Sequence, residues 1–184
     1  VAGHRAGLGP DDRAGHAALA ARMAVVFAVT AQGDERIVLE GQEVTGLVRA
    51  EQTGQGASRV AAWPEVREAL LSRQRSFAES PGLVADGRDM GTVVFPEAPL
   101  KIFLTATPDE RARRRYNQLK DKDSAVSLAA LSREIAERDL RDSTRSVAPL
   151  RPASDAFVID STGVAVEAIV ERVIELGRAR ALWR

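Results

Sequence analysis

The stretch that decides the fold reads Pro81-Gly-Leu-Val-Ala-Asp-Gly-Arg-Asp-Met-Gly-Thr-Val-Val-Phe-Pro96. It begins with a short apolar run and then breaks into charged residues and glycines, from Asp86 to Gly91. Such a pattern is typical of the carboxyl end of a buried parallel strand, where ligands of open α/β sheets bind. A strand followed by an ordinary polar loop fits this stretch equally well. The rest of the chain decides between the two interpretations.

From residue 81 onward, strand patterns alternate with helical patterns. A second buried strand is predicted at 100–106 and a third at 156–160. Thr107-Pro-Asp-Glu110 has the form of a capping box, and Ser127 is predicted to cap a second helix that runs to about residue 142. An amphipathic helix is expected over 163–182. This alternation predicts a parallel sheet and hence an α/β fold.

The preceding residues predict a small antiparallel lobe with helices, over about 23–80. A helix is expected at 13–22, before this lobe. The lobe itself is expected to contain strands at 24–30 and 36–40 and helices at about 49–62 and 64–79. The turn at 41–46 leaves room for a third short strand. We expect one domain over 1–184, in which this lobe is joined to the parallel-sheet part at 81–184.

Composition excludes several classes of protein. The formal net charge is zero, so the chain has no general electrostatic attraction to nucleic acid or to an anionic membrane. The chain has no cysteine, which excludes disulfides and thiolate metal sites, and His4 and His16 lack the spacing of zinc ligands. No apolar run approaches the roughly 18 residues of a membrane span. We expect a cytoplasmic monomer without a metal site built from its side chains.

Arginine dominates the basic residues, because only three of the 26 are lysines. Arg88 follows the first predicted strand, a group lies at 111–115, and Arg138, Arg141 and Arg145 share one helical face if that helix persists to Arg145. Interleaved acids also fit ordinary surface ion pairs. The position of Arg145, at a helix end that leads into the third strand, favours a ligand site. Phosphoryl transfer needs positive groups at both the phosphoryl donor and the phosphoryl acceptor, and these arginines could supply them. The alternative, a basic helix that contacts RNA, is disfavoured because the chain has few aromatic residues.

Three motifs carry a resemblance. They are Ala85-Asp-Gly-Arg-Asp-Met-Gly-Thr-Val-Val-Phe-Pro96, Glu137-Arg-Asp-Leu-Arg-Asp142 with Arg145-Ser-Val-Ala-Pro-Leu150, and Val60-Ala-Ala-Trp-Pro-Glu-Val-Arg67. Together they resemble bacterial cytidylate kinases, over nearly the whole chain and in the order and spacing of that family. The resemblance implies a P-loop nucleoside-monophosphate kinase core, in which ATP phosphorylates CMP or dCMP with Mg²⁺. The lobe at 23–80 would be the NMP-binding insert, and a lid helix would lie at about 111–126.

The resemblance also implies a role for each matching position on the CMP side. The positions are Ser58, Arg67 and Asp89 for the cytosine edge, Arg88 and Arg145 for the phosphate, and Arg138 and Asp142 for the ribose side. Carboxylate, hydroxyl and guanidinium groups together can pair with the amino donor and the ring acceptors of cytosine.

On the ATP side, Arg114 and Arg115 match the lid arginines that reach the phosphates. Asp86 would lie at the strand tip, near where magnesium and the phosphates meet. In the transfer itself, we expect Arg88 and Arg145 to position the acceptor and Arg114 to neutralise the donor.

The chain departs from the family in one respect, because no stretch matches the glycine-rich G-x-x-x-x-G-K-[ST] loop and every lysine lies at 101 or later. That loop supplies the main cradle for the β- and γ-phosphates. In the family, the first strand lies between the strands that correspond to 82–86 and 101–106. Without it, both of these strands lose hydrogen-bond partners. We expect a kinase chain that lacks its amino-terminal P-loop segment and is inactive alone. The alternatives are a non-catalytic CMP-binding module and, less favoured, an arginine-rich RNA-binding protein.

Overall fold

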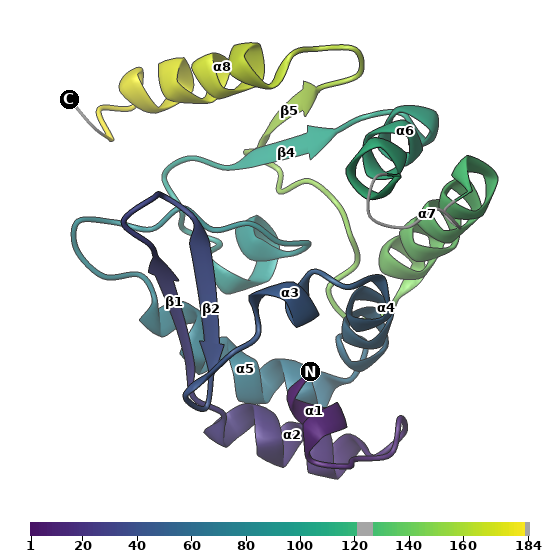
Figure 1. The fold of residues 1–184 in the computed structure, drawn as a ribbon. Coiled ribbons are helices and arrows are strands. Elements are labelled where there is room, and N and C mark those ends of the chain that lie inside the picture. The colour runs from purple at the N-terminus through teal and green to yellow at the C-terminus, as the bar shows by residue number, and fades with distance from the viewer. Residues whose placement is uncertain (121–126, 183–184) are drawn as a thin grey trace. The chain divides into compact units, whose positions relative to one another are not determined.

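The structure is a computed structural model that describes residues 1–120 and 127–182. They form two compact units, Val1–Leu83 and Val84–Arg184, and each unit is described by itself. The first contains a small antiparallel sheet and the second a pair of parallel strands (Figure 1). The fold is therefore mixed α/β, as the sequence predicts.

The antiparallel sheet of the first unit has the strand order β1-β2-β3. Its strands are β1 (Val25–Val29), β2 (Glu35–Leu39) and β3 (Gln42–Glu43). Gly33, with φ of 88°, sits in the turn between β1 and β2, a backbone conformation that glycine adopts without strain. Ile37, Leu39 and Val44 form a buried cluster beside this sheet. The predicted hairpin and the short third strand are both confirmed.

Five helices complete the first unit. They are α1 (Ala2–Arg5), α2 (Arg13–Arg22), α3 (Thr45–Val48), α4 (Glu51–Val60) and α5 (Pro64–Ser76). The side chain of Asp12 caps α2, because its Oδ1 accepts the N–H of Gly15 at 2.8 Å. Helices α2 and α5 pack against each other around Ala20, Trp63 and Val66.

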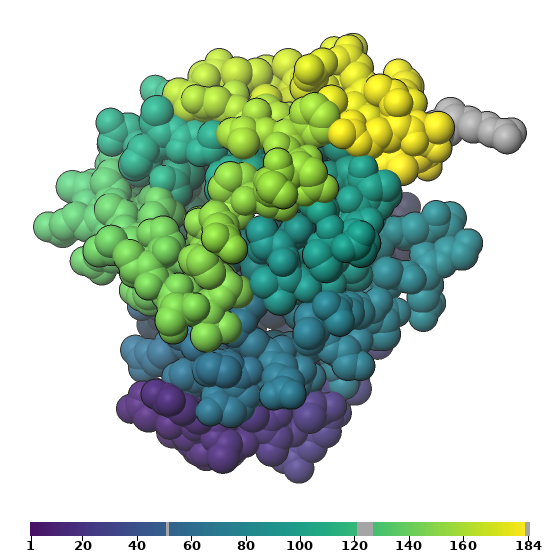
Figure 2. Space-filling model, turned by 180° about the vertical axis from the view of Figure 1, so that it is seen from behind, coloured from purple at the N-terminus to yellow at the C-terminus, as the bar shows by residue number. Residues whose placement is uncertain are grey.

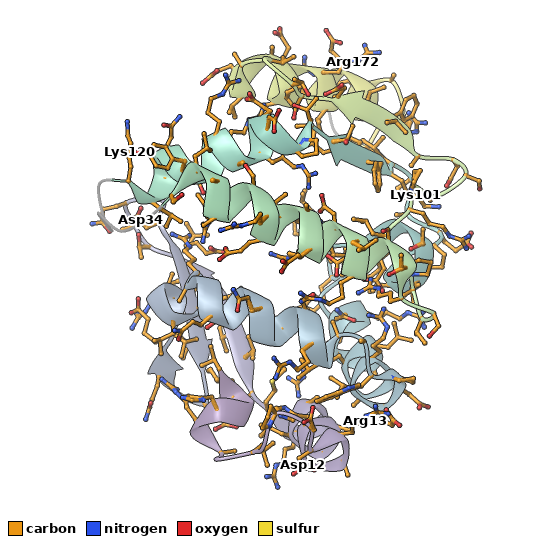
Figure 3. The ribbon with its side chains drawn as sticks, turned by 90° about the vertical axis from the view of Figure 1, so that its right-hand side faces the viewer. Asp12, Arg13, Asp34, Lys101, Lys120 and Arg172 are labelled. Atoms are coloured by element: carbon orange, nitrogen blue, oxygen red, sulfur yellow. The ribbon has the colours of Figure 1, made fainter. Side chains whose placement is uncertain are left out.

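The second unit is built on the strands β4 (Ile102–Thr105) and β5 (Phe157–Asp160), which pair in parallel with Ile102 opposite Phe157. Its helices are α6 (Pro108–Leu119), α7 (Leu128–Thr144) and α8 (Val166–Arg178). Helix α6 follows β4 directly, and α7 lies alongside α6 (Figures 1 and 3). Residues 121–126 of the predicted lid helix lie outside the described residues.

The predicted start of α6 is confirmed, but the capping box there is one-sided. Thr107 Oγ1 accepts the N–H of Glu110 at 3.3 Å. The N–H of Thr107 donates instead to Thr162 Oγ1, at 3.0 Å, and the Glu110 carboxylate is bound by arginines. The cap therefore also ties the start of α6 to the residues that follow β5.

The strand predicted at 82–86 is wrong, because these residues have no regular secondary structure and Val84 is 97% exposed. A strand needs a neighbour to complete its hydrogen-bond ladder, and among the described residues β4 is paired only with β5. Residues 86–89 after it also lack regular secondary structure, and a short π-helix, η1 (Met90–Val94), follows them.

The second predicted strand exists but is not buried. Leu104 of β4 is 56% exposed and Val158 of β5 is 60% exposed. Few elements of the second unit cover the faces of this two-stranded sheet. The apolar pattern of the sequence therefore predicted more burial of the strands than the structure shows. The predicted closing helix is also shorter than expected, since α8 begins at Val166 and ends at Arg178.

No helix within residues 1–120 and 127–182 is both long and apolar enough to cross a membrane.

Candidate functional site

Asp142 lies at the centre of a group of arginines in the second unit, and its side chain is only 4% exposed. Its Oδ2 lies 3.3 Å from Arg88 Nε and 3.8 Å from Arg138 Nε, and its Oδ1 lies 4.0 Å from Arg145 Nη1. We call these four residues the Asp142 cluster. Three positive groups against one negative group leave it with two positive charges.

Helix α7 and its C-terminus bring three members of the Asp142 cluster together. Arg138 and Asp142 are four residues apart and therefore share one helical face. The helix ends at Thr144, and Arg145 turns into an extended conformation, with φ of −61° and ψ of 140°. Arg145 Nε then donates to Ala148 O at 2.5 Å. The condition under which Arg138, Arg141 and Arg145 would share one helical face, a helix that persists to Arg145, is therefore not met, and Arg141 is exposed.

The chain after α7 folds back on the helix end and holds this arrangement. The N–H of Leu150 donates to the backbone carbonyl of Asp142 at 2.8 Å. Residues 146–156, which lead to β5, run along the surface of the second unit (Figure 2, yellow-green). The last turn of α7 is thus also held by a backbone hydrogen bond from the segment that follows it.

Arg88 reaches the Asp142 cluster from the segment before η1. The carbonyl of its neighbour Asp89 accepts the N–H groups of Thr92, Val93 and Val94, at 3.2, 2.9 and 3.3 Å. Asp89 itself is buried, at 7% exposure. Burial is the largest cause that lowers the pKa of Arg88, and the neighbouring Arg138 lowers it further. Arginine keeps its charge in proteins, so this guanidinium is a cation held in a partly desolvated position.

A donor of the Asp142 cluster is left open in this structure. Arg145 is only 8% exposed at its side chain, and its Nη2 has no hydrogen-bond partner among the residues of the described part of the chain. A buried unpaired donor costs roughly 1–3 kcal/mol. An anion with several oxygens, such as a phosphate, would satisfy it with a charge-assisted hydrogen bond. Charge and geometry therefore both suit an anionic ligand.

A second arginine site lies at the carboxyl ends of β4 and β5. Arg114 Nε donates to Glu110 Oε1 at 2.8 Å, and its Nη1 donates to Ser161 Oγ at 3.0 Å. Ser161 Oγ in turn donates to the carbonyl of Thr105 at 2.9 Å. Arg113 also binds Glu110, and this hydrogen bond is the main cause that holds the pKa of Glu110 below its ordinary value, against the opposing effect of burial.

The remaining predicted site residues lie in different surroundings. Arg115 donates from Nη1 to Gln118 Oε1, at 3.4 Å, on its own helix. In the first unit, Ser58 is buried on α4 at 8% exposure, and Arg67 Nη1 on α5 donates to the carbonyl of Ala61 at 3.2 Å. Asp86 is exposed and does not stand at a strand tip, since no strand forms there.

Sequence reasoning missed two contacts around this site. Ser161, which is 3% exposed and binds Arg114, was not singled out, although its position directly after a predicted strand was a signal. The sequence offers surface ion pairs as one interpretation of the interleaved acids, of which Asp139 is one, but Asp139 binds Arg111 of α6. Within residues 1–120 and 127–182, no three histidine or acidic side chains gather in a way that could hold a metal ion.

Comparison with known proteins adds a finding that is independent of the geometry. The family described as cytidylate kinase matches residues 5–179. A cytidylate kinase of Pseudomonas aeruginosa is 64% identical over 158 residues, which cover 85% of this chain and 69% of that protein. Cytidylate kinases of Pseudomonas savastanoi and Pseudomonas fluorescens are 61% and 60% identical over 157 residues, again covering 85% of this chain and 69% of each relative.

Proposed function

Because the chain belongs to the cytidylate kinase family, we propose that, together with a P-loop segment, its residues bind CMP or dCMP as the acceptor of the ATP γ-phosphoryl group, giving CDP or dCDP and ADP. The observation that carries the proposal is the Asp142 cluster, with its two excess positive charges and the open Nη2 of buried Arg145. The acceptor phosphate is the group that this arrangement suits best.

In this proposal Arg88 and Arg145 bind the acceptor phosphate, and Arg138 and Asp142 contact the ribose side. An acceptor oxygen attacks the γ-phosphorus of ATP in line, while the bond from that phosphorus to the leaving oxygen of ADP breaks. Positive groups fixed on the acceptor reduce the repulsion between the two anions and hold them in line. Ser58, Arg67 and Asp89 are assigned to the cytosine edge.

On the donor side we assign Arg114, and Arg115 beside it, to the ATP phosphates. Support comes from the carboxyl ends of two parallel strands, where Arg114 is held by Glu110 and Ser161 and where ligands of parallel sheets commonly bind. Magnesium in kinase sites is held largely by substrate phosphates. The described side chains form no ligand cluster for it, so no step is assigned to residues that would bind the ion. Asp86 stays a predicted neighbour of the phosphates.

We further propose that residues 1–184 on their own bind CMP without turning it over, since no stretch of them has the glycine-rich lysine loop that cradles ATP phosphates. The alternative function, a non-catalytic CMP-binding module, is favoured by the same observation. Joining a P-loop segment to this chain separates the two, because only the kinase proposal expects turnover to appear. Monomeric state and cytoplasmic location stay predictions.

Titration calorimetry with CMP and with ATP tests the proposal, together with a coupled assay for ADP. CMP is expected to bind and ATP turnover to be absent. Arg145→Ala should weaken CMP binding at least about tenfold, because a charge-assisted hydrogen bond contributes about 1.5–3 kcal/mol. Arg172→Ala, in an exposed ion pair on α8, is the matched control. Unchanged CMP binding in Arg145→Ala would remove this residue from the site, and turnover near that of complete family enzymes would contradict the predicted inactivity.

A further inference from the structure

Arg111 joins three elements of the second unit. Its Nη1 and Nη2 donate to the two carboxylate oxygens of Asp139 at 2.9 and 2.5 Å. Its Nε donates to the carbonyl of Ala106, just after β4, at 3.2 Å. Arg111 lies on α6 and Asp139 on α7, so one guanidinium links the end of β4 with both helices. The two-bond arrangement also fixes the relative orientation of the guanidinium and the carboxylate.

Asp139 lies beside the Asp142 cluster but does not belong to it. It follows Arg138 directly on α7 and precedes Asp142 by less than one helical turn. Asp139 and Asp142, three residues apart on α7, are neighbours on the helix surface, so Asp139 lies next to the acid that Arg88 contacts. In keeping with this, burial and the charges of Arg138 and Arg111 lower the pKa of Arg88, whereas the charges of Asp142 and Asp139 raise it. Of the two acids, Asp142 is the one that Arg88 contacts, at 3.3 Å.

We attribute that choice to the charge of Asp139, which Arg111 neutralises. Arg111 occupies both of its oxygens in the bidentate pair. A carboxylate without this partner would present a full negative charge next to a cluster with excess positive charge. The Arg88 side chain is 38% exposed, so it has room to turn.

We propose that Arg111 is a positioning residue for the acceptor-phosphate site: by binding both oxygens of Asp139, it prevents this acid from pairing with Arg88. Arg88 then stays directed at Asp142 and at the acceptor phosphate. The part of the inference that concerns CMP rests on the proposed function. The choice of partner by Arg88 is a property of the chain itself and is tested without a ligand.

The ligand-free test is a crystal structure of Arg111→Gln. We expect the distance from Arg88 Nε to Asp142 Oδ2 to exceed the ion-pair limit of about 4 Å, and Arg88 to approach Asp139 within that limit. Arg111→Met also removes the charge and keeps an unbranched side chain, and it gives the same readout if the glutamine variant does not fold. Arg88 remaining on Asp142 in the variant that folds would overturn the inference.

Calorimetry with CMP gives the second readout. Arg111→Gln should weaken CMP binding by about fivefold or more, because the acceptor phosphate loses part of the Arg88 interaction. Adding Asp139→Asn to Arg111→Gln should restore most of the affinity, since the competing carboxylate is then gone. A purely structural role for the pair predicts the opposite, namely a double variant no better than the single one, and that result would also overturn the inference.

A matched control is Arg172→Gln, which breaks an exposed ion pair on α8 and should leave CMP binding unchanged (Arg172 in Figure 3). A wild-type chain that does not bind CMP would contradict the proposed function. The inference would still be supported if the Arg88 side chain moved from Asp142 to Asp139 in Arg111→Gln. The two failures are therefore distinguishable.

Discussion

Replacing Asp142 by asparagine removes the carboxylate from the Asp142 cluster and keeps the size of the side chain. Arg88 and Arg138 are 38% and 43% exposed at their side chains, so each of their ion pairs contributes only about 0–1 kcal/mol. Arg145 is 8% exposed, and its Nη1 lies 4.0 Å from Asp142 Oδ1, beyond hydrogen-bond distance. At an effective dielectric constant of about 20, two unit charges at this separation attract by about 4 kcal/mol, and desolvation offsets much of this. We therefore expect Asp142→Asn to lower the free energy of unfolding of the second unit by about 2 kcal/mol.

The same substitution should strengthen the binding of a simple anion, although it destabilises the chain. The cluster gains one net positive charge, so inorganic phosphate should stabilise the variant more than the wild type, through its preferential binding to the folded state. Hydrogen exchange of the α7 amides, with and without phosphate, measures both effects within the second unit. Glu175→Gln, in the exposed pair on α8, is the control. If the α7 amides of Asp142→Asn exchanged at the wild-type rate, and phosphate slowed them equally in both proteins, the reasoning that this carboxylate offsets the charge of the arginines would be refuted.

Two further predictions concern contacts beside the strands. Ser161→Ala removes the acceptor of Arg114 Nη1 and the hydrogen bond to Thr105, so the free energy of unfolding, measured by thermal unfolding, should fall by about 1–3 kcal/mol. Ser161→Thr keeps the hydroxyl and should recover most of this stability. An alanine variant as stable as the wild type would contradict the prediction. A hydrogen bond from Lys101 is the main cause that holds the pKa of Asp155 below its ordinary value of 3.8. The stabilisation by this pair is fully present above pH 3.8 and is lost as the pH falls through the lower pKa of Asp155 in the folded state. Asp155→Asn should therefore reduce stability at neutral pH, and its stability should approach that of the wild type in strong acid. A stability difference that does not change with pH would count against this pair.

Features set by neighbouring residues were predictable from the sequence. The caps at Asp12, Thr107 and Ser127 depend on a side chain within three residues of the amide it binds, and all three helices begin as expected. The hairpin of β1 and β2 is also local. The parallel pairing of β4 with β5 follows from the alternation of strands and helices, although the strands are distant in sequence.

The strand predicted at 82–86 shows where such reasoning fails. Its apolar residues match a buried strand, yet whether a strand forms depends on a partner that no local pattern reveals. The arginine cluster shows a related limit. The family resemblance grouped Arg138 with Asp142 on the ribose side, but the change of direction at Arg145 lies in the backbone after the helix. Asp139 looked like one more surface acid, because its partner Arg111 is 28 residues away.

The segment at 82–86 has a practical consequence for handling the protein. A protease binds its substrate as an extended chain of several residues, and exposed segments without hydrogen-bonded structure are preferred cleavage sites. Residues 82–86 are all exposed and without regular secondary structure, and they span the boundary between the two compact units. Brief digestion with an enzyme that cleaves after small apolar side chains should therefore cut near Val84 first. A cut there would divide the chain at the boundary between its two compact units.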